Sequence, residues 1–346
     1  MKSIQQLKIA TILYLLVPSL LFLCTWVHLW IGIPCIVFMV FYVKNIFETA
    51  EDKTDNGIAT QHFFISIGIS LLLNFMLGIG EFRYQTYDFQ ANNFKFYDLV
   101  THQLPVYYPK QQTFLCYYTG YYLPSAMLAK VFGLASCRYI SYLWSVLGLA
   151  LVFLWISTFS RKSFMAVIVG ILLFSHSWIV IKVLMNIEFF KEVCQPYYFQ
   201  LNQFKLITQS FVKNYSWAIQ HTLPACLGAC VLIHIYQRDD FKQELKYLLL
   251  MLLSTMFWSP LTTIGLFPFV AFCFLQNLKM LFNSSEMKNL LWMIGIVVAF
   301  SPLMLYFIST EGIHANNTEF MWETGVGFWF LIYLIYIFSN FIIWGV

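Results

Sequence analysis

Asp88 is the side chain best suited to chemistry in this sequence. It lies in a polar, aromatic segment, Glu81 to Gln112, between long apolar blocks. A carboxylate at such a place can accept a proton from an acceptor hydroxyl, or hold a cation that neutralises a phosphate leaving group. The alternative is structural, because Asp88 stands just before an expected helix and can serve as its N-cap. Asp98 is a second acidic candidate, on the wetter side of the same helix.

Gln220 and His221 form a second candidate pair, at the outer end of the apolar block from Trp217 to Tyr236. A neutral imidazole and an amide can bind sugar hydroxyls or a phosphate oxygen, and polar groups at that depth are usually retained for a reason. The alternative is an imidazole hydrogen-bonded between helices. Arg83 is a further binding candidate, for which the alternative is an interfacial ion pair with Glu81.

Several site types are missing from the sequence. It holds no Gly-rich phosphate loop, no Ser-His-Asp order and no dinucleotide-binding fingerprint. It also lacks zinc-ligand spacing, so we assign no metal ligands and leave a divalent cation open. Soluble nucleotides are scarce outside the cell, so a reaction there needs an activated substrate that arrives by the membrane.

The composition excludes an ordinary soluble domain. Of 346 residues, 60% are hydrophobic and only 10% are charged, whereas soluble domains carry charge on roughly a quarter of their residues. The net charge of +4 is too small and too scattered for a nucleic-acid partner. We therefore expect a membrane protein whose partners are lipids; the oligomeric state stays open.

Apolar blocks near the length that a membrane helix needs recur along the whole chain, and we expect an all-α, polytopic transmembrane bundle of about 9–11 spans. The clean blocks are Ile9–Cys24, Trp26–Val43, Phe63–Gly80, Tyr139–Phe159, Phe164–Val183, Trp217–Tyr236, Leu290–Ile308 and Val326–Val346. Two stretches are less regular: Phe114 to Phe132, and Tyr247 to Phe274, which Ser259-Pro260 interrupts. Proline there indicates a kink or a hairpin turn.

We expect one integral membrane domain over residues 1–346, with an external loop at 81–113 and a second polar segment at 184–216. Phe89, Asn93, Phe96 and Val100 recur at helical spacing, which predicts a surface helix in the external loop. Short loops rich in Lys and Arg, such as those holding Lys8 and Lys246, are placed in the cytoplasm. Placing Arg161-Lys162 inside and Asn186 to Ser216 outside leaves three blocks between two external loops, so either 114–132 is re-entrant or one of those loops lies on the other side. The chain ends inside an apolar block, as a fragment of a longer protein would.

Four groups of residues carry a resemblance to a family. They are Asp88-Phe89-Gln90 followed by Asn93 and Asp98-Leu99; Tyr117 to Pro124 with Lys130 and Gly133; Trp217 with Gln220-His221; and Trp258-Ser259-Pro260 with Gly265-Leu266 and Pro268. In this order they resemble a group of bacterial multi-pass proteins, over roughly Gly80 to Phe269. More distantly, the layout resembles the GT-C glycosyltransferase superfamily.

The resemblance implies transfer of a sugar from a polyprenyl-phosphate donor to an acceptor on the outer face of the bacterial cytoplasmic membrane. It gives Asp88 the role of base or acceptor-positioning group, and it adds Tyr118 to the substrate-binding candidates Gln220, His221, Asp98 and Arg83. In the bacterial group a Lys-His pair follows the acidic residue by three positions, where this chain has Ala91-Asn92. If that pair contacts phosphate, this chain binds its donor differently or is inactive. Two alternatives are therefore kept: a transporter or flippase for a lipid-linked intermediate, and a non-catalytic membrane subunit.

Overall fold

The computed structural model describes residues 3–49, 57–83, 85, 87–110, 112–115, 118–160, 163–174, 211–237, 241–281 and 287–309. Helices hold 83% of them, which confirms the all-α class. The chain divides into two compact units: residues 1–106 with 118–303, and residues 107–117 with 304–346. Residues 161–162, most of the polar segment at 184–216 and the block at 326–346 lie outside the described residues.

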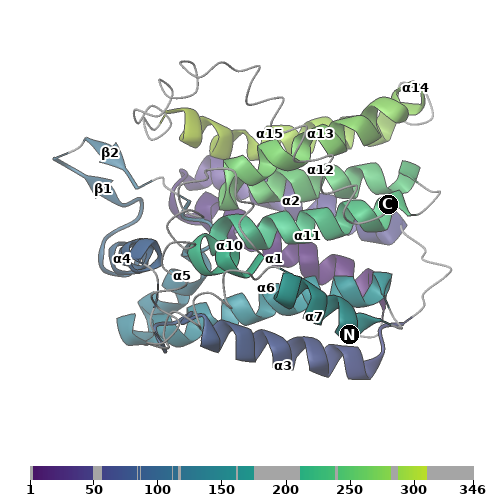
Figure 1. The fold of residues 1–346 in the computed structure, drawn as a ribbon. Helices are drawn as coiled ribbons and strands as arrows, with labels where there is room; N and C mark the ends of the chain where they lie inside the picture. The colour runs from purple at the N-terminus through teal and green to yellow at the C-terminus, as the bar shows by residue number, and fades with distance from the viewer. Residues whose placement is uncertain are drawn as a thin grey trace, which may run out of the picture. The chain divides into compact units, whose positions relative to one another are not determined.

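The first unit contains most of the helices (Figure 1). In chain order they are α1 (Ile4–Thr25), α2 (Leu29–Thr49), α3 (Thr60–Met76), α4 (Tyr87–Thr101), α5 (Leu123–Phe132), the 3-10 turn η1 (Leu134–Ser136), α6 (Cys137–Phe159), α7 (Phe164–Phe174), α10 (Phe211–Trp217), α11 (Ile219–Tyr236), α12 (Phe241–Trp258), α13 (Pro260–Gln276), α14 (Leu278–Leu281) and α15 (Met287–Ser309), whose last turns belong to the second unit.

Five described helices are long and apolar enough to cross a membrane: α1, α2, α6 with η1, α11 and α15. They support the membrane class expected from the composition. The expected block at 114–132 is not one continuous helix, because α5 begins only at Leu123. Its ten residues extend about 15 Å, roughly half of a bilayer core. The break expected at Ser259-Pro260 is confirmed, since α12 ends at Trp258 and α13 begins at Pro260.

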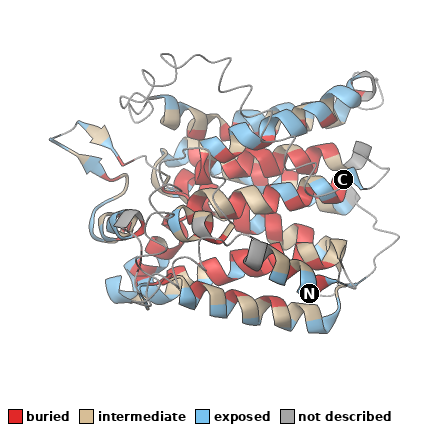
Figure 2. Ribbon diagram, in the orientation of Figure 1, coloured by how far each residue is buried: buried red, intermediate tan, exposed pale blue. Residues whose placement is uncertain are grey.

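The core of the first unit is formed by α1, α6, α11 and α12, where buried residues concentrate (Figure 2). Helix α1 packs against α2, α6 and α12, and α3 packs along α6. The outward faces of α2, α3 and α13 instead expose large apolar side chains, such as Trp30, Phe64 and Ile264. A helix with an exposed apolar face is stable in lipid but costly in water, so these faces suit contact with acyl chains.

Charged residues gather where α1 and α12 begin. Lys8 forms a buried ion pair with Glu244, and Lys246 Nζ donates to Asn45 Oδ1 at 2.8 Å. At the other end of the same two helices, the rings of Phe22 and Phe257 lie 4.9 Å apart. Two of the lysines placed by sequence on the cytoplasmic side, Lys8 and Lys246, therefore lie toward the same end of the bundle.

The second unit contains a small hairpin that the sequence analysis did not predict. Strands β1 (Tyr107–Tyr108) and β2 (Thr113–Phe114) are antiparallel, and the rings of Tyr107 and Phe114 are 5.0 Å apart. The hydroxyl of Tyr306 donates to the carbonyl of Leu115 within this unit.

Candidate functional site

Helix α4 is the amphipathic helix expected in the external loop, and it organises the candidate site. Phe89, Phe96 and Leu99 are buried, whereas Gln90, Phe94 and Tyr97 are exposed, so one face of the helix packs on the protein and the other is open. The helix packs on α5. At its C-terminal end the Lys130 ammonium donates to the carbonyls of Val100, at 3.1 Å, and His102, at 2.7 Å. A cation at the C-terminal end of a helix is favourable because it satisfies carbonyls and opposes the helix dipole.

Glu81 lies in a tight turn between α3 and α4. Gly78 and Gly80 have positive φ angles, and so does Glu81, with φ 63°. A Cβ on Gly80 would lie 2.5 Å from the carbonyl oxygen of Arg138, so only glycine fits there. The turn is held to α4 by amides: Asn93 Nδ2 donates to Glu81 Oε1 at 3.0 Å and to Gln85 Oε1 at 2.7 Å.

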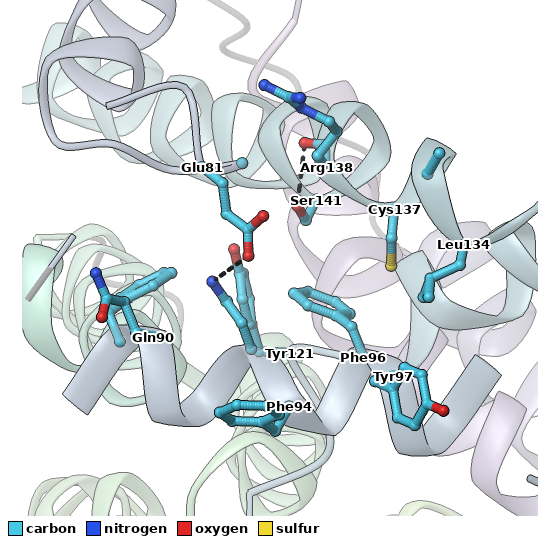
Figure 3. A pocket seen from close by; sticks show the side chains of 14 residues that line it. Glu81, Gln90, Phe94, Phe96, Tyr97, Tyr121, Leu134, Cys137, Arg138 and Ser141 are labelled. Atoms are coloured by element: carbon cyan, nitrogen blue, oxygen red, sulfur yellow. Dashed lines mark hydrogen bonds between the residues drawn. The ribbon is translucent and has the colours of Figure 1, made fainter. Parts of the chain in front are cut away.

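A cavity of about 670 Å³ lies between α4 and the first turns of α6. Its walls hold both polar and aromatic side chains (Figure 3). The lining residues are Gly80, Glu81, Phe89, Gln90, Asn93, Phe94, Phe96, Tyr97, Tyr121, Leu134, Ala135, Cys137, Arg138 and Ser141. This volume is in the range of small-molecule sites.

Tyr121 is fixed beside this cavity by hydrogen bonds between helices. Its hydroxyl lies 2.7 Å from Ser145 Oγ on α6. The carbonyl of Ser145 accepts a bond from Tyr215 of α10, at 3.4 Å, and Tyr215 also donates to Asn74 Oδ1 of α3, at 2.9 Å. These bonds join α3, α6, α10 and the segment before α5.

Lys95 is the residue that the sequence analysis missed. Its side chain is buried, with 8% exposed, and its Nζ donates to Asn92 Oδ1 at 2.6 Å. The ammonium also lies 4.9 Å from the centre of the Tyr122 ring. Burial lowers the pKa of Lys95 to about 7. An ammonium removed from water in this way is stabilised by an anion, so Lys95 is suited to bind one.

A second polar group joins the beginnings of α11 and α13 and lies within electrostatic range of Lys95. His221 Nδ1 is 2.6 Å from Ser259 Oγ, and the ring of Tyr118 stands edge-on to the imidazole at 4.5 Å. Ser259 is the N-cap of α13. Next to His221, Gln220 is 3% exposed, and its Oε1 has no hydrogen-bond partner among the described residues. A buried acceptor without a donor is costly unless a ligand or water satisfies it.

The structure brings some predicted site residues together and separates others. Tyr118 and His221 are in contact, and Gln220 is adjacent in sequence, whereas Arg83 lies over the Phe75 ring, 5.0 Å from its centre. Arg83 forms no ion pair with Glu81 within the described part of the chain.

The two acidic candidates are both on α4. Asp98 lies beside His102, at 3.8 Å between Oδ1 and Nδ1. Asp88 is the second residue of α4, not the residue before it, and its side chain is outside the described part. Position 88 shares a helical face with Lys95, seven residues further on, because seven residues complete nearly two turns. That spacing is the signal that could have identified Lys95.

No group of three His, Cys, Asp or Glu side chains suited to a metal ion occurs among the residues described. Comparison with protein-family models, curated proteins and solved structures finds no match to this chain.

Proposed function

We propose that this chain is a multi-pass, GT-C-like glycosyltransferase of the bacterial cytoplasmic membrane. It moves a sugar from a polyprenyl-phosphate donor to an acceptor on the extracytoplasmic face. The observation that carries this proposal is the buried Lys95, which shares a face of α4 with position 88 and is within electrostatic range of His221. One helix, α4, thus supplies both the acidic residue at position 88 and a cation, Lys95, that can bind phosphate.

The reaction assigns one task to each group. The acceptor hydroxyl oxygen attacks the anomeric carbon of the donor, and the bond from that carbon to the phosphate oxygen breaks. Asp88 takes the hydroxyl proton, and the phosphate leaves with the bonding electrons on its lipid carrier. Lys95 offsets the negative charge that grows on the leaving phosphate.

The burial of Lys95 fits this task. With a pKa of about 7, the side chain is partly neutral near neutral pH when no anion is present. A bound phosphate favours the charged form and raises that pKa, so donor binding also recruits a proton. The Lys-His pair of the resembled group is absent at 91–92, and in this proposal Lys95 with His221 takes its place.

Gln220, next to His221, can bind the sugar. Its buried Oε1, without a donor among the described residues, can accept a hydrogen bond from a sugar hydroxyl. The exposed apolar faces of α2, α3 and α13 suit contact with lipid. In this proposal the polyprenyl tail of the donor lies in that lipid.

The test is substitution of Asp88 in cells that depend on the full chain. Asp88→Asn removes the base but keeps the size of the side chain, and we expect the glycosylated product to fall by about 100-fold or more. Glu48→Gln is the matched control, because it also exchanges a carboxylate for an amide, at an exposed position on α2 outside the site.

Unchanged product at equal protein level would refute the transferase proposal. If the product falls in Asp88→Asn cells because a lipid-linked intermediate accumulates on the inner leaflet, the result favours the flippase alternative. A stable partner that copurifies, with no effect of either variant, favours the non-catalytic subunit.

A further inference from the structure

The cavity between α4 and α6 is chemically different from the Lys95 side of α4. Residues 93, 96 and 97 line it, whereas 88 and 95 lie on another part of the helical circumference. A ligand bound there would therefore be recognised by other groups than Lys95. Its volume of about 670 Å³ fits a headgroup or a small molecule.

One carboxylate controls the charge of this cavity. Two charged residues line it, Glu81 and Arg138. The Arg138 guanidinium is engaged with rings outside, 4.7 Å from the centre of Phe82 and 5.3 Å from that of Tyr139. Figure 3 shows it turned away from the cavity, while the Glu81 carboxylate reaches toward α4. The cavity thus presents a negative group and no facing cation among its lining residues.

Aromatic rings form the remaining walls. Phe96 and Tyr121 are buried, and Tyr97 is about half exposed, so their rings border the space without closing it. The faces of aromatic rings attract cations, and substituted ammonium groups are often bound in a cage of aromatic side chains. A carboxylate beside such a cage adds an opposite charge.

The strained backbone at Glu81 indicates that the surrounding structure fixes the position of this residue. A non-glycine residue with φ 63° is strained, and such strain persists where the surrounding structure requires it. Here Asn93 fixes the carboxylate from α4 at 3.0 Å. The result is a carboxylate held in place while its residue stays exposed.

We propose that this cavity binds an alkylammonium group. A membrane lipid headgroup is one source and a soluble amine is the other. The lipid source is favoured by position, because Val131 and Phe132, beside lining residue Leu134, expose apolar surface that suits contact with acyl chains. The inference goes beyond sugar transfer and does not depend on it.

Lipid and amine binding to the purified full chain test this proposal. Native mass spectrometry compares phosphatidylethanolamine with phosphatidylglycerol, and equilibrium dialysis with tetramethylammonium tests the soluble source. We expect the wild type to bind phosphatidylethanolamine at least fivefold more tightly than phosphatidylglycerol. Binding of tetramethylammonium with the same dependence on Glu81, without lipid selectivity, would identify a soluble amine instead.

Two variants and one control locate the site. Glu81→Gln keeps an acceptor for Asn93 but removes the charge, and we expect at least a fivefold loss of affinity. Tyr97→Ala removes one exposed ring and is expected to weaken binding roughly two- to fivefold, as for one cation–π contact. Glu48→Gln, in the exposed pair with Lys44 on α2, is expected to change nothing.

The proposal fails if neither ligand depends on Glu81, or if Glu48→Gln weakens binding as much as Glu81→Gln. If Glu81→Gln does not fold, as judged by its thermal unfolding in detergent, Tyr97→Ala decides: unchanged affinity for both ligands would then overturn the proposal.

Discussion

Replacing Lys95 by methionine should change how the stability of this protein depends on pH. Lys95 is 8% exposed, and its pKa is lowered by burial from 10.5 to about 7. Methionine has a similar length, packs well in irregular apolar surroundings and cannot ionise. The substitution therefore removes the titration while it keeps most of the volume against Tyr122.

The sign and size follow from the two pKa values. Between pH 7 and 10.5 the unfolded chain binds a proton at Lys95 that the folded chain has lost, so the free energy of unfolding rises with pH in that window. The full shift corresponds to roughly 5 kcal/mol of destabilisation below pH 7, at about 1.4 kcal/mol per pKa unit. From pH 6 to pH 9 the wild type should gain about 2 to 3 kcal/mol from this residue.

Denaturant titrations of wild type and Lys95→Met in one detergent, followed by tryptophan fluorescence at pH 6 and pH 9, measure this difference. Other groups titrate in both proteins, so the difference between the two pH dependences belongs to Lys95. Lys44→Met, at an exposed position, is the control and should keep the wild-type dependence. The reasoning is refuted if Lys95→Met gains as much stability between pH 6 and pH 9 as the wild type does.

Substitutions at Gly120, Lys8 and Lys130, with their controls, test the packing. Gly120→Ala should destabilise the fold by about 1–3 kcal/mol, because its Cβ would lie 2.5 to 2.9 Å from backbone atoms at the end of α12; Gly170→Ala, with open space around it, should be neutral or stabilising in the same thermal unfolding assay. Lys8→Met should cost about 3–5 kcal/mol because it leaves the Glu244 carboxylate without its cation, and Lys8→Met with Glu244→Leu should recover most of that loss; equal stability of single and double variants would contradict this. Lys130→Met should release the end of α4, seen as faster hydrogen exchange of its last turn with a loss of only about 0.3–1 kcal/mol in stability, and unchanged exchange there would show that the cap is unimportant.

The elements that could be predicted are those with a strong local pattern. The apolar lengths of α1, α6 and α11 predicted helices that the structure confirms, and the spacing of Phe89 and Phe96 predicted α4. The hairpin was missed because strands of two residues are too short to show an alternating pattern. For the irregular block at 114–132 the sequence left a re-entrant segment as one alternative, because average hydropathy does not show that the helix starts only at Leu123, beside Pro124.

The site was harder to predict because its contacts join distant parts of the chain. Tyr215 and Asn74 are 141 residues apart, and His221 and Ser259 are 38 apart. No spacing rule indicates such pairs. Glu81 was considered only for its neighbour Arg83, since a left-handed backbone at a glutamate has no sequence signal. Lys95 did have a signal, because it repeats the helical face of position 88.

The hydrogen bonds that join Tyr215 to Asn74 and to Ser145 restrict how the helices can assemble. Hydrocarbon offers no water to replace a lost partner, and one residue of rotation turns a helix by about 100°. Were α3 or α6 to turn by that angle, several buried oxygens would lose their donors at once, whereas apolar side chains could still find other neighbours. Directional hydrogen bonds therefore select one rotation of each helix about its axis, whereas apolar packing alone would permit many rotations.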